Sequence, residues 1–303
     1  MQAKAHILAA VDFSDSSAEA LREAVRISGD EGAALTVIHV VDSRVMDGLC
    51  ERIHIDPEAI LAETEKRLGE FIWRNVGRGA EISLRVIPGH PFDELLKAVE
   101  RLQATLLVMG AHGSKDDPLR VGVIASKCIR KAPVDVLLVR ELHREKRFRK
   151  VLACVDFSEH SKHAARRALE FAKRDSAPIE FLNIYQPLSD RAPMADYFGI
   201  GPEAISDDEM MESNRVWLEK FAAELLGDSP EIEHTETVKS CYSIAHGIAE
   251  HVRDNDIDLL TLGTLGRTGL KVLLLGTTAE KVIHSATCST LAVKPDGFQY
   301  THS

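Results

Sequence analysis

Short apolar runs alternate with amphipathic stretches along the whole chain. In the first half these runs occupy residues 7–11, 35–41, 82–87, 105–109 and 134–139. The second half repeats the pattern, with strands expected near residues 151–155, 179–184, 232–238, 258–262 and 290–294. Continuous apolar runs of this length are typical of strands buried on both faces of a parallel sheet. The alternation predicts right-handed βαβ units and a doubly wound α/β sheet in each half.

Helical patterns fill the spaces between the apolar runs. Residues 14–17 include serines suited to cap a first helix, and Asp56-Pro57 pairs a capping residue with proline at the first helical position. The same spacing of apolar residues predicts further helices over 91–102 and 123–131. Each half therefore has the strands and helices of a complete domain.

The two halves are copies of each other. Residues 7–17 align with residues 151–161 at an offset of 144, and Gly110 and Gly113 match Gly263 and Gly266 at an offset of 153. A small drift of the offset in one direction is expected from a duplication followed by loop insertions. The repeat is as long as a domain, so the sequence predicts one domain over 1–144 and a second over 145–303.

Composition excludes several classes of function. The net charge of −10 disfavours nucleic acids and anionic membranes as partners, because both need basic patches. No segment approaches the ~20 apolar residues of a membrane span, so no membrane insertion is expected. The five cysteines show no paired spacing, which favours reduced thiols and a cytoplasmic location.

A glycine-rich loop near the end of the chain carries the clearest chemistry. Gly263 and Gly266 follow an apolar run, and after nine intervening residues Gly276 precedes Thr277 and Thr278 at the start of a helical pattern. Glycine allows close approach of a ligand to the backbone, and a helix N-terminus offers unpaired N–H groups to an anion. This run predicts a phosphate site and hence a nucleotide.

Three further features surround the loop. Thr277 and Glu280 have the spacing of a capping box. Arg267 and Lys271 could neutralise phosphate charge. Asp156 ends the first strand of its copy at a topological switch point, where it is either a turn residue before the next helix or a polar contact to a ligand.

The first copy departs from this pattern. Asp12 is retained, but the hydroxyl pair is replaced by Val123-Ile124 after Gly122, and Asp116-Asp117 adds negative charge to the loop. We therefore expect a degenerate nucleotide loop in the first copy.

The chain shows no catalytic apparatus. It has no G-x-x-x-x-G-K-[ST] loop, no G-x-S-x-G elbow and no kinase-type set of motifs. His160 and His163 lie three residues apart but have no third ligand, so no metal site is assigned. His39 ends an apolar run and is expected to be a core or crevice residue. No catalytic residue is assigned.

Three segments together resemble the universal stress protein family in its tandem form. They are V-D-F-S over 155–158, the loop from Gly263 to Ile283, and A-T-C-S-T-L-A-V-K over 286–294. The resemblance implies two five-stranded parallel sheets of order 3-2-1-4-5, with helices on both faces. It also implies that 134–139 and 290–294 pair antiparallel within the chain as a pseudo-dimer.

The same resemblance implies ATP as the ligand, with or without Mg²⁺. Asp156 and the backbone of Ile184 would hold the adenosine end. The ribose and phosphates would be held by Gly263, Gly266, Gly276, Thr277 and Thr278.

The leading hypothesis is a stress-response regulatory protein that binds ATP in its second domain and hydrolyses it slowly at most. One alternative is a nucleotidyl transferase or pyrophosphatase, although the H-x-G-H or S-G-G-x-D-S signatures of those enzymes are replaced here by D-F-S-D and D-F-S-E. The other is an assembly module that binds no nucleotide. A homodimer of chains is compatible with each.

Overall fold

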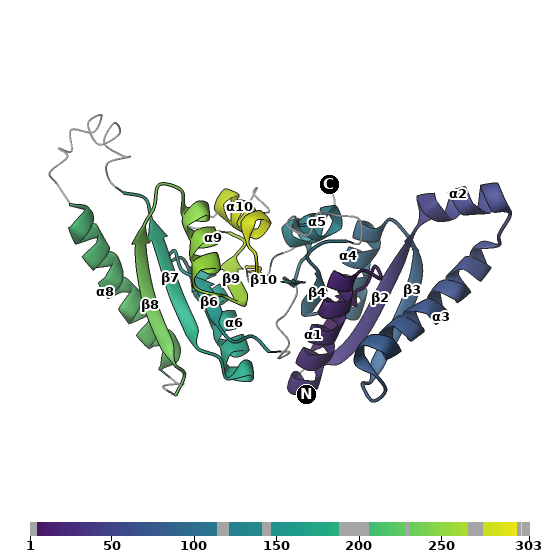
Figure 1. Ribbon diagram of the computed structural model, residues 1–303, viewed down its shortest axis with the longest axis horizontal. Helices are drawn as coiled ribbons and strands as arrows, with labels where there is room; N and C mark the ends of the chain where they lie inside the picture. Colours follow the sequence, from purple (N-terminus) through teal and green to yellow (C-terminus); the bar gives the residue numbers. More distant parts are fainter. Residues whose placement is uncertain are drawn as a thin grey trace. The chain divides into compact units, whose positions relative to one another are not determined.

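A computed structural model gives the structure of the protein (Figure 1). It describes residues 5–113, 121–140, 147–187, 206–227, 231–265, 275–295 and 298. Two compact units divide the chain, and the C-terminal unit runs from Arg147 to Pro295. The predicted domain boundary at 144/145 falls outside the described residues and stays a prediction.

The N-terminal unit alternates strands and helices. Its elements are β1 (His6–Ala10), α1 (Asp15–Glu31), β2 (Ala34–Asp42), α2 (Ser43–Ile53), α3 (Pro57–Val76), β3 (Ile82–Gly89), α4 (Pro91–Leu102), β4 (Leu106–Gly110), α5 (Val123–Lys131) and β5 (Asp135–Val139). The strands lie in the order β3-β2-β1-β4-β5, and each neighbouring pair is parallel. Helices α1 and α3 cover one face of this sheet, and α4 and α5 cover the other (Figure 1).

The C-terminal unit repeats the arrangement. Its elements are β6 (Val151–Cys154), α6 (Glu159–Asp175), β7 (Ile179–Tyr185), α8 (Asp207–Leu226), β8 (His234–Ser240), α9 (Ile244–Asp254), β9 (Leu259–Gly263), α10 (Thr277–Ser285) and β10 (Ser289–Val293). The strand order is β8-β7-β6-β9-β10, again with parallel neighbours. The predicted fold class and the order 3-2-1-4-5 are confirmed in both units.

Local sequence explains where the first helices begin. The Ser14 side chain caps α1 by accepting from the N–H of Ser17, and Ser158 caps α6 through Ser161 in the same way. Helix α3 has Asp56 as its N-cap and Pro57 at its first position, as the sequence predicts. These caps fix the turns that follow β1 and β6, which are the turns that shape the site.

Two helices differ from the sequence expectation. Helix α2 was not expected, although Val45, Met46 and Leu49 have helical spacing, and none of its described side chains is buried. Helix α8 begins with a capping box, in which Ser206 and Glu209 bond each other's backbone N–H. That S-x-x-E signal was available in the sequence but was not used.

The expected pairing of the two fifth strands concerns the relation between the units, and it stays a prediction. Within the described residues, no helix combines the length and the apolar character that crossing a membrane requires.

Candidate functional site

The two central strands end in matching turns. In the N-terminal unit β1 lies between β2 and β4, and in the C-terminal unit β6 lies between β7 and β9, so strand order reverses at both places. Asp156 Oδ1 accepts hydrogen bonds from Ser158 N–H at 3.0 Å and from Ser158 Oγ at 2.5 Å. Asp12 makes the same two contacts with Ser14. Both aspartates therefore have the turn role, which leaves a ligand role for Asp156 untested.

A phenylalanine in the left-handed region follows each aspartate. Phe13 has φ 66° and Phe157 has φ 63°, which is uncommon for a bulky side chain. The Phe13 ring lies 4.4 Å from the ring of His39 and has the Arg67 guanidinium 4.1 Å above it. The Phe157 ring lies 6.3 Å from that of Trp217. An equivalent phenylalanine, Phe71 or Phe221, packs edge-on against the turn in each copy, and the two copies differ in the second partner, which is Arg67 in one and Trp217 in the other.

At the end of β7, a side chain replaces a ladder bond. The N–H of Val155 donates to Leu182 O at 2.8 Å, and a continuing parallel ladder would next join Ile184 N–H to Val155 O. Instead the Asn183 side-chain amide donates to Val155 O at 2.8 Å. Because alternate residues of a strand face the same side, the backbone N–H and C=O of Ile184 face the β6 side beyond this point. The predicted contact of the Ile184 backbone with adenosine stays a prediction.

Asn183 also holds an unsatisfied atom. Its side chain is 3% exposed, and its Oδ1 atom is buried without a hydrogen-bond partner among the described residues. A buried acceptor without a partner is uncommon, and an unseen ligand is one explanation. Sequence analysis missed this residue, although its equivalence to His39 at the offset of 144 could have indicated it.

The first glycine of each loop is required by packing. A Cβ atom on Gly110 would lie 2.5 Å from Ser16 Oγ and 2.9 Å from Ser17 N. On Gly263 it would lie 3.3 Å from His160 O, a tight but less severe contact. Neither glycine has a positive φ. These residues therefore let a strand end approach the first helix, whether or not a phosphate binds.

The second half of the predicted loop opens α10. Gly276 is the N-cap, with φ −65° and ψ 143°, and its N–H donates to Thr264 O at 2.8 Å. No side chain caps the helix, so the expected capping box of Thr277 and Glu280 is wrong: Thr277 is already the first helical residue, and Thr278 is the second. Gly266, Arg267 and Lys271 lie outside the described residues.

Helix α5 begins in the same way with different side chains. Gly122 is its N-cap, with φ −61° and ψ 155°, and its N–H donates to Ala111 O at 2.8 Å. Val123 is 68% exposed in the position of Thr277. The two helix starts are therefore alike in backbone and differ in side chains. Asp116 and Asp117 lie outside the described residues.

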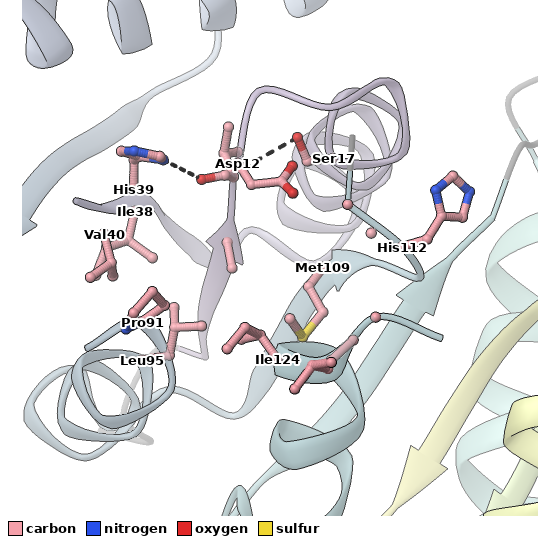
Figure 2. A pocket seen from close by; sticks show the side chains of 17 residues that line it. Asp12, Ser17, Ile38, His39, Val40, Pro91, Leu95, Met109, His112 and Ile124 are labelled. Atoms are coloured by element: carbon pink, nitrogen blue, oxygen red, sulfur yellow. Dashed lines mark hydrogen bonds between the residues drawn. The ribbon is translucent and has the colours of Figure 1, made fainter. Parts of the chain in front are cut away.

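A cavity of about 350 Å³ lies at the switch point of the N-terminal unit (Figure 2). It is bounded by the ends of β1, β2 and β4 and by the first turns of α4 and α5. His39 lines this cavity, so its expected place in a crevice is confirmed. Its Nδ1 lies 2.7 Å from Val11 O, and burial is the main cause of a pKa below the usual range.

Other candidate chemistry is less supported. No group of three or more potential metal ligands forms among the residues that the structure describes, and His160 and His163 lie in or beside the first turn of α6. The Cys154 thiol at the end of β6 has its pKa raised, mainly by burial. A thiol with a raised pKa stays protonated and is a poor nucleophile.

Comparison with known proteins places this geometry in a family. The chain is 30% identical over 152 residues to universal stress protein MJ0531 of Methanocaldococcus jannaschii. The aligned segment covers 50% of this chain and 84% of that protein. It is 25% identical over 147 residues to universal stress protein YxiE of Bacillus subtilis, covering 48% and 99%.

Solved structures agree on the fold. The crystal structure of a universal stress protein from Archaeoglobus fulgidus superposes with a TM-score of 0.62 at 18% identity, covering 95% of this chain and 98% of that one. The model of the universal stress protein family matches twice, over residues 5–140 and 147–294. The chain therefore belongs to the universal stress protein family, with two copies of its domain in tandem.

Proposed function

We propose that the protein is a stress-response regulator that binds ATP in its C-terminal unit. Asp156 and the backbone of Ile184 hold the adenosine end. Gly263, Gly276, Thr277 and Thr278 hold the ribose and phosphates, together with Gly266. Mg²⁺ would arrive with the phosphates, since the cation is commonly held through phosphate oxygens.

The observation that carries this proposal is the opening of α10. Two hydroxyl side chains occupy its first two positions, and no side chain caps its N–H groups. Such an end combines unpaired donors with a partial positive charge, which suits phosphate oxygens. The helix also follows β9, next to β6 in the sheet, so it begins at the edge where Asp156 lies.

A second observation supports the adenosine end. Asn183 occupies the carbonyl of Val155 and so leaves the backbone of Ile184 beyond the ladder. Asn183 Oδ1 is buried without a partner in the described part of the chain, so it suits a ligand with an N–H donor. An adenine ring has both donors and acceptors along its edge and fits this arrangement.

Isothermal titration of the full chain with ATP and Mg²⁺ tests the proposal. The informative variant is Gly276→Val, because a side chain there would occupy the path of the phosphates. At φ −65° and ψ 143° any residue is unstrained, so the variant is expected to fold. Gly122→Val is the matched control in the other copy.

We expect the wild type and Gly122→Val to bind ATP with one site and Gly276→Val to lose binding. A wild-type protein that gives no heat and carries no nucleotide when purified would contradict the proposal.

We also propose that the protein is a binder rather than an ATPase. Turnover above background that disappears in Asp156→Ala would instead favour the enzyme.

We further propose that the two copies form an internal pseudo-dimer through β5 and β10. A strand at a sheet edge leaves every second N–H unpaired, whereas a paired strand protects all of them. Hydrogen exchange of the full chain should therefore show slow exchange at successive amides of both strands. Fast exchange at alternate amides would contradict the pairing. A cytoplasmic location, consistent with five cysteines that form no disulfide, remains part of this proposal.

A further inference from the structure

The cavity of the N-terminal unit is formed where the second copy has its proposed nucleotide site. Figure 2 shows Met109 and Ile124 facing Pro91 and Leu95 across the cavity, with Asp12 and His39 at its rim. Its volume of about 350 Å³ is within the range of small-molecule sites, roughly 300–1,000 Å³. The cavity therefore has room for a compact ligand.

The walls of this cavity are apolar. Eight of the lining side chains are aliphatic, proline or methionine residues larger than alanine: Val11, Ile38, Val40, Pro91, Leu95, Met109, Val123 and Ile124. The last two stand where the other copy has Thr277 and Thr278. Val123 is 68% exposed and stands at the rim of the cavity.

The charges around the cavity disfavour an anion. None of the seventeen described lining residues is lysine or arginine, and one, Asp12, is an acid. An anion would lose its hydration against apolar walls with no lysine or arginine among the described lining residues to compensate, which is costly, and only the N–H groups at the start of α5 would attract it. The replacement of both hydroxyls removes two further groups that a phosphate could use.

The polar atoms select a ligand with hydrogen-bond donors. His39 Nδ1 faces the carbonyl of Val11 and so carries the proton, which leaves Nε2 of the neutral ring as an acceptor. Burial, which lowers the pKa of His39, favours that neutral ring. The Asp12 carboxylate also accepts only. A ligand here meets apolar walls and two acceptors.

We propose that the N-terminal unit binds an uncharged, largely apolar molecule that carries an N–H or O–H donor. The proposal rests on the cavity alone and does not depend on ATP binding in the C-terminal unit. The two copies would then bind ligands of different charge at equivalent positions.

A matched pair of fluorescent probes tests the charge selection. N-phenyl-1-naphthylamine is an uncharged aromatic amine with one N–H donor, and 8-anilino-1-naphthalenesulfonate has the same ring system with an added sulfonate. Both brighten in apolar sites. Titrated into the full chain, the neutral probe should bind with one site, and the sulfonate should bind roughly ten- to a hundredfold more weakly.

Two variants locate the binding. Val123→Asp puts a carboxylate on the cavity rim at the first position of α5, where an acid favours the helix. Val45→Asp is the matched control, because Val45 is 59% exposed in the first turn of α2 and does not line the cavity. Val123→Asp should lower the affinity for the neutral probe about tenfold or more, and Val45→Asp should leave that affinity unchanged.

Ile124→Trp provides a second test by filling the cavity, with circular dichroism to verify folding. It should abolish probe binding. Gly276→Val should leave probe binding intact even if it removes ATP binding, which separates this proposal from the first. Equal affinity for the two probes, or probe binding unaffected by Val123→Asp and Ile124→Trp, would overturn the proposal.

Discussion

The side-chain amide of Asn183 donates a hydrogen bond of 2.8 Å to the main-chain carbonyl of Val155. In the other copy, His39 Nδ1 lies 2.7 Å from the carbonyl of Val11. Two chemically different side chains thus satisfy the same carbonyl at the end of the central strand. In both copies the contact takes the place of the next ladder bond, so the backbone of the second strand remains directed toward the ligand side.

Asn183→Ala should destabilise the C-terminal unit by about 1–3 kcal/mol, because it leaves the carbonyl of Val155 buried without a donor. Asn183→His is the matched variant, since histidine makes this contact in the first copy. Urea unfolding can be followed by the fluorescence of Trp217 in a Trp73→Phe background, as the chain has only two tryptophans. Equal losses in the alanine and histidine variants would contradict the role given to this contact.

Gly110→Ala should be more damaging than Gly263→Ala. The added Cβ on Gly110 would lie 2.8 Å from Ser16 C, a backbone atom that cannot move alone, whereas Gly263 has 3.3 Å to its nearest neighbours. Overpacking of this kind costs about 1–3 kcal/mol, and Gly110→Ala should reach the upper part of that range. Thermal unfolding of both variants checks the order. The reverse order would show that the glycines serve something other than packing.

Glu180 gives the stability of the C-terminal unit a dependence on pH. Its carboxylate accepts from Thr237 Oγ1 at 2.6 Å, lies 2.9 Å from His251 Nε2 and pairs with Lys150 at 3.1 Å. Burial acts to raise the pKa of Glu180, but these partners together lower it from 4.5 to about 2. The carboxylate therefore stabilises the folded state at pH values above about 4.5, and this contribution is lost as the pH falls toward 2.

Glu180→Gln should consequently cost about 1–3 kcal/mol at neutral pH, with the difference from the wild type shrinking below about pH 4.5. Denaturant unfolding at a series of pH values measures this. Glu212→Gln, on the exposed face of α8, is the control and should stay close to the wild type at every pH. A difference between Glu180→Gln and wild type that does not change with pH would contradict the assignment.

Exchanging the helix starts should exchange the ligand preference. The double substitution Thr277→Val with Thr278→Ile gives α10 the opening residues of α5. If the proposed function holds, it should lower the affinity for ATP at least about tenfold, because it removes two partners of the phosphates. The affinity for adenosine should change little. The reverse exchange in the first copy, Val123→Thr with Ile124→Thr, should leave ATP binding by the second copy unaffected. A loss of adenosine affinity equal to that of ATP would point to misfolding rather than to the phosphates.

The sequence was sufficient for most of the fold because the evidence is local. Apolar runs and capping residues predicted α4 over Pro91–Leu102 and α5 over Val123–Lys131, which are the observed bounds. Helix α2 was missed although Val45, Met46 and Leu49 have helical spacing, because the segment directly continues β2 and has no Pro or Gly to separate it from the strand. The site was less predictable, because the role of Asn183 depends on the register of β7 against β6, which a single chain does not reveal.

The helix opening of the second copy shows the same limit. Thr277 and Glu280 have the right spacing for a capping box, but Gly276 is the N-cap, with extended backbone angles, and Thr277 is already helical. Spacing alone could not distinguish these two candidates for the N-cap.

The close approach of Gly110 to Ser16 bears on how duplicated domains diverge. A copy that gives up its original ligand still cannot give up this glycine without harming its own stability, so purifying selection will preserve it long after binding is lost. The retained glycine therefore indicates that the packing of the fold is unchanged, and it does not indicate that a ligand binds. Substitutions at the openings of α5 and α10 carry no such structural penalty, and it is there that a tandem chain is free to acquire a second specificity.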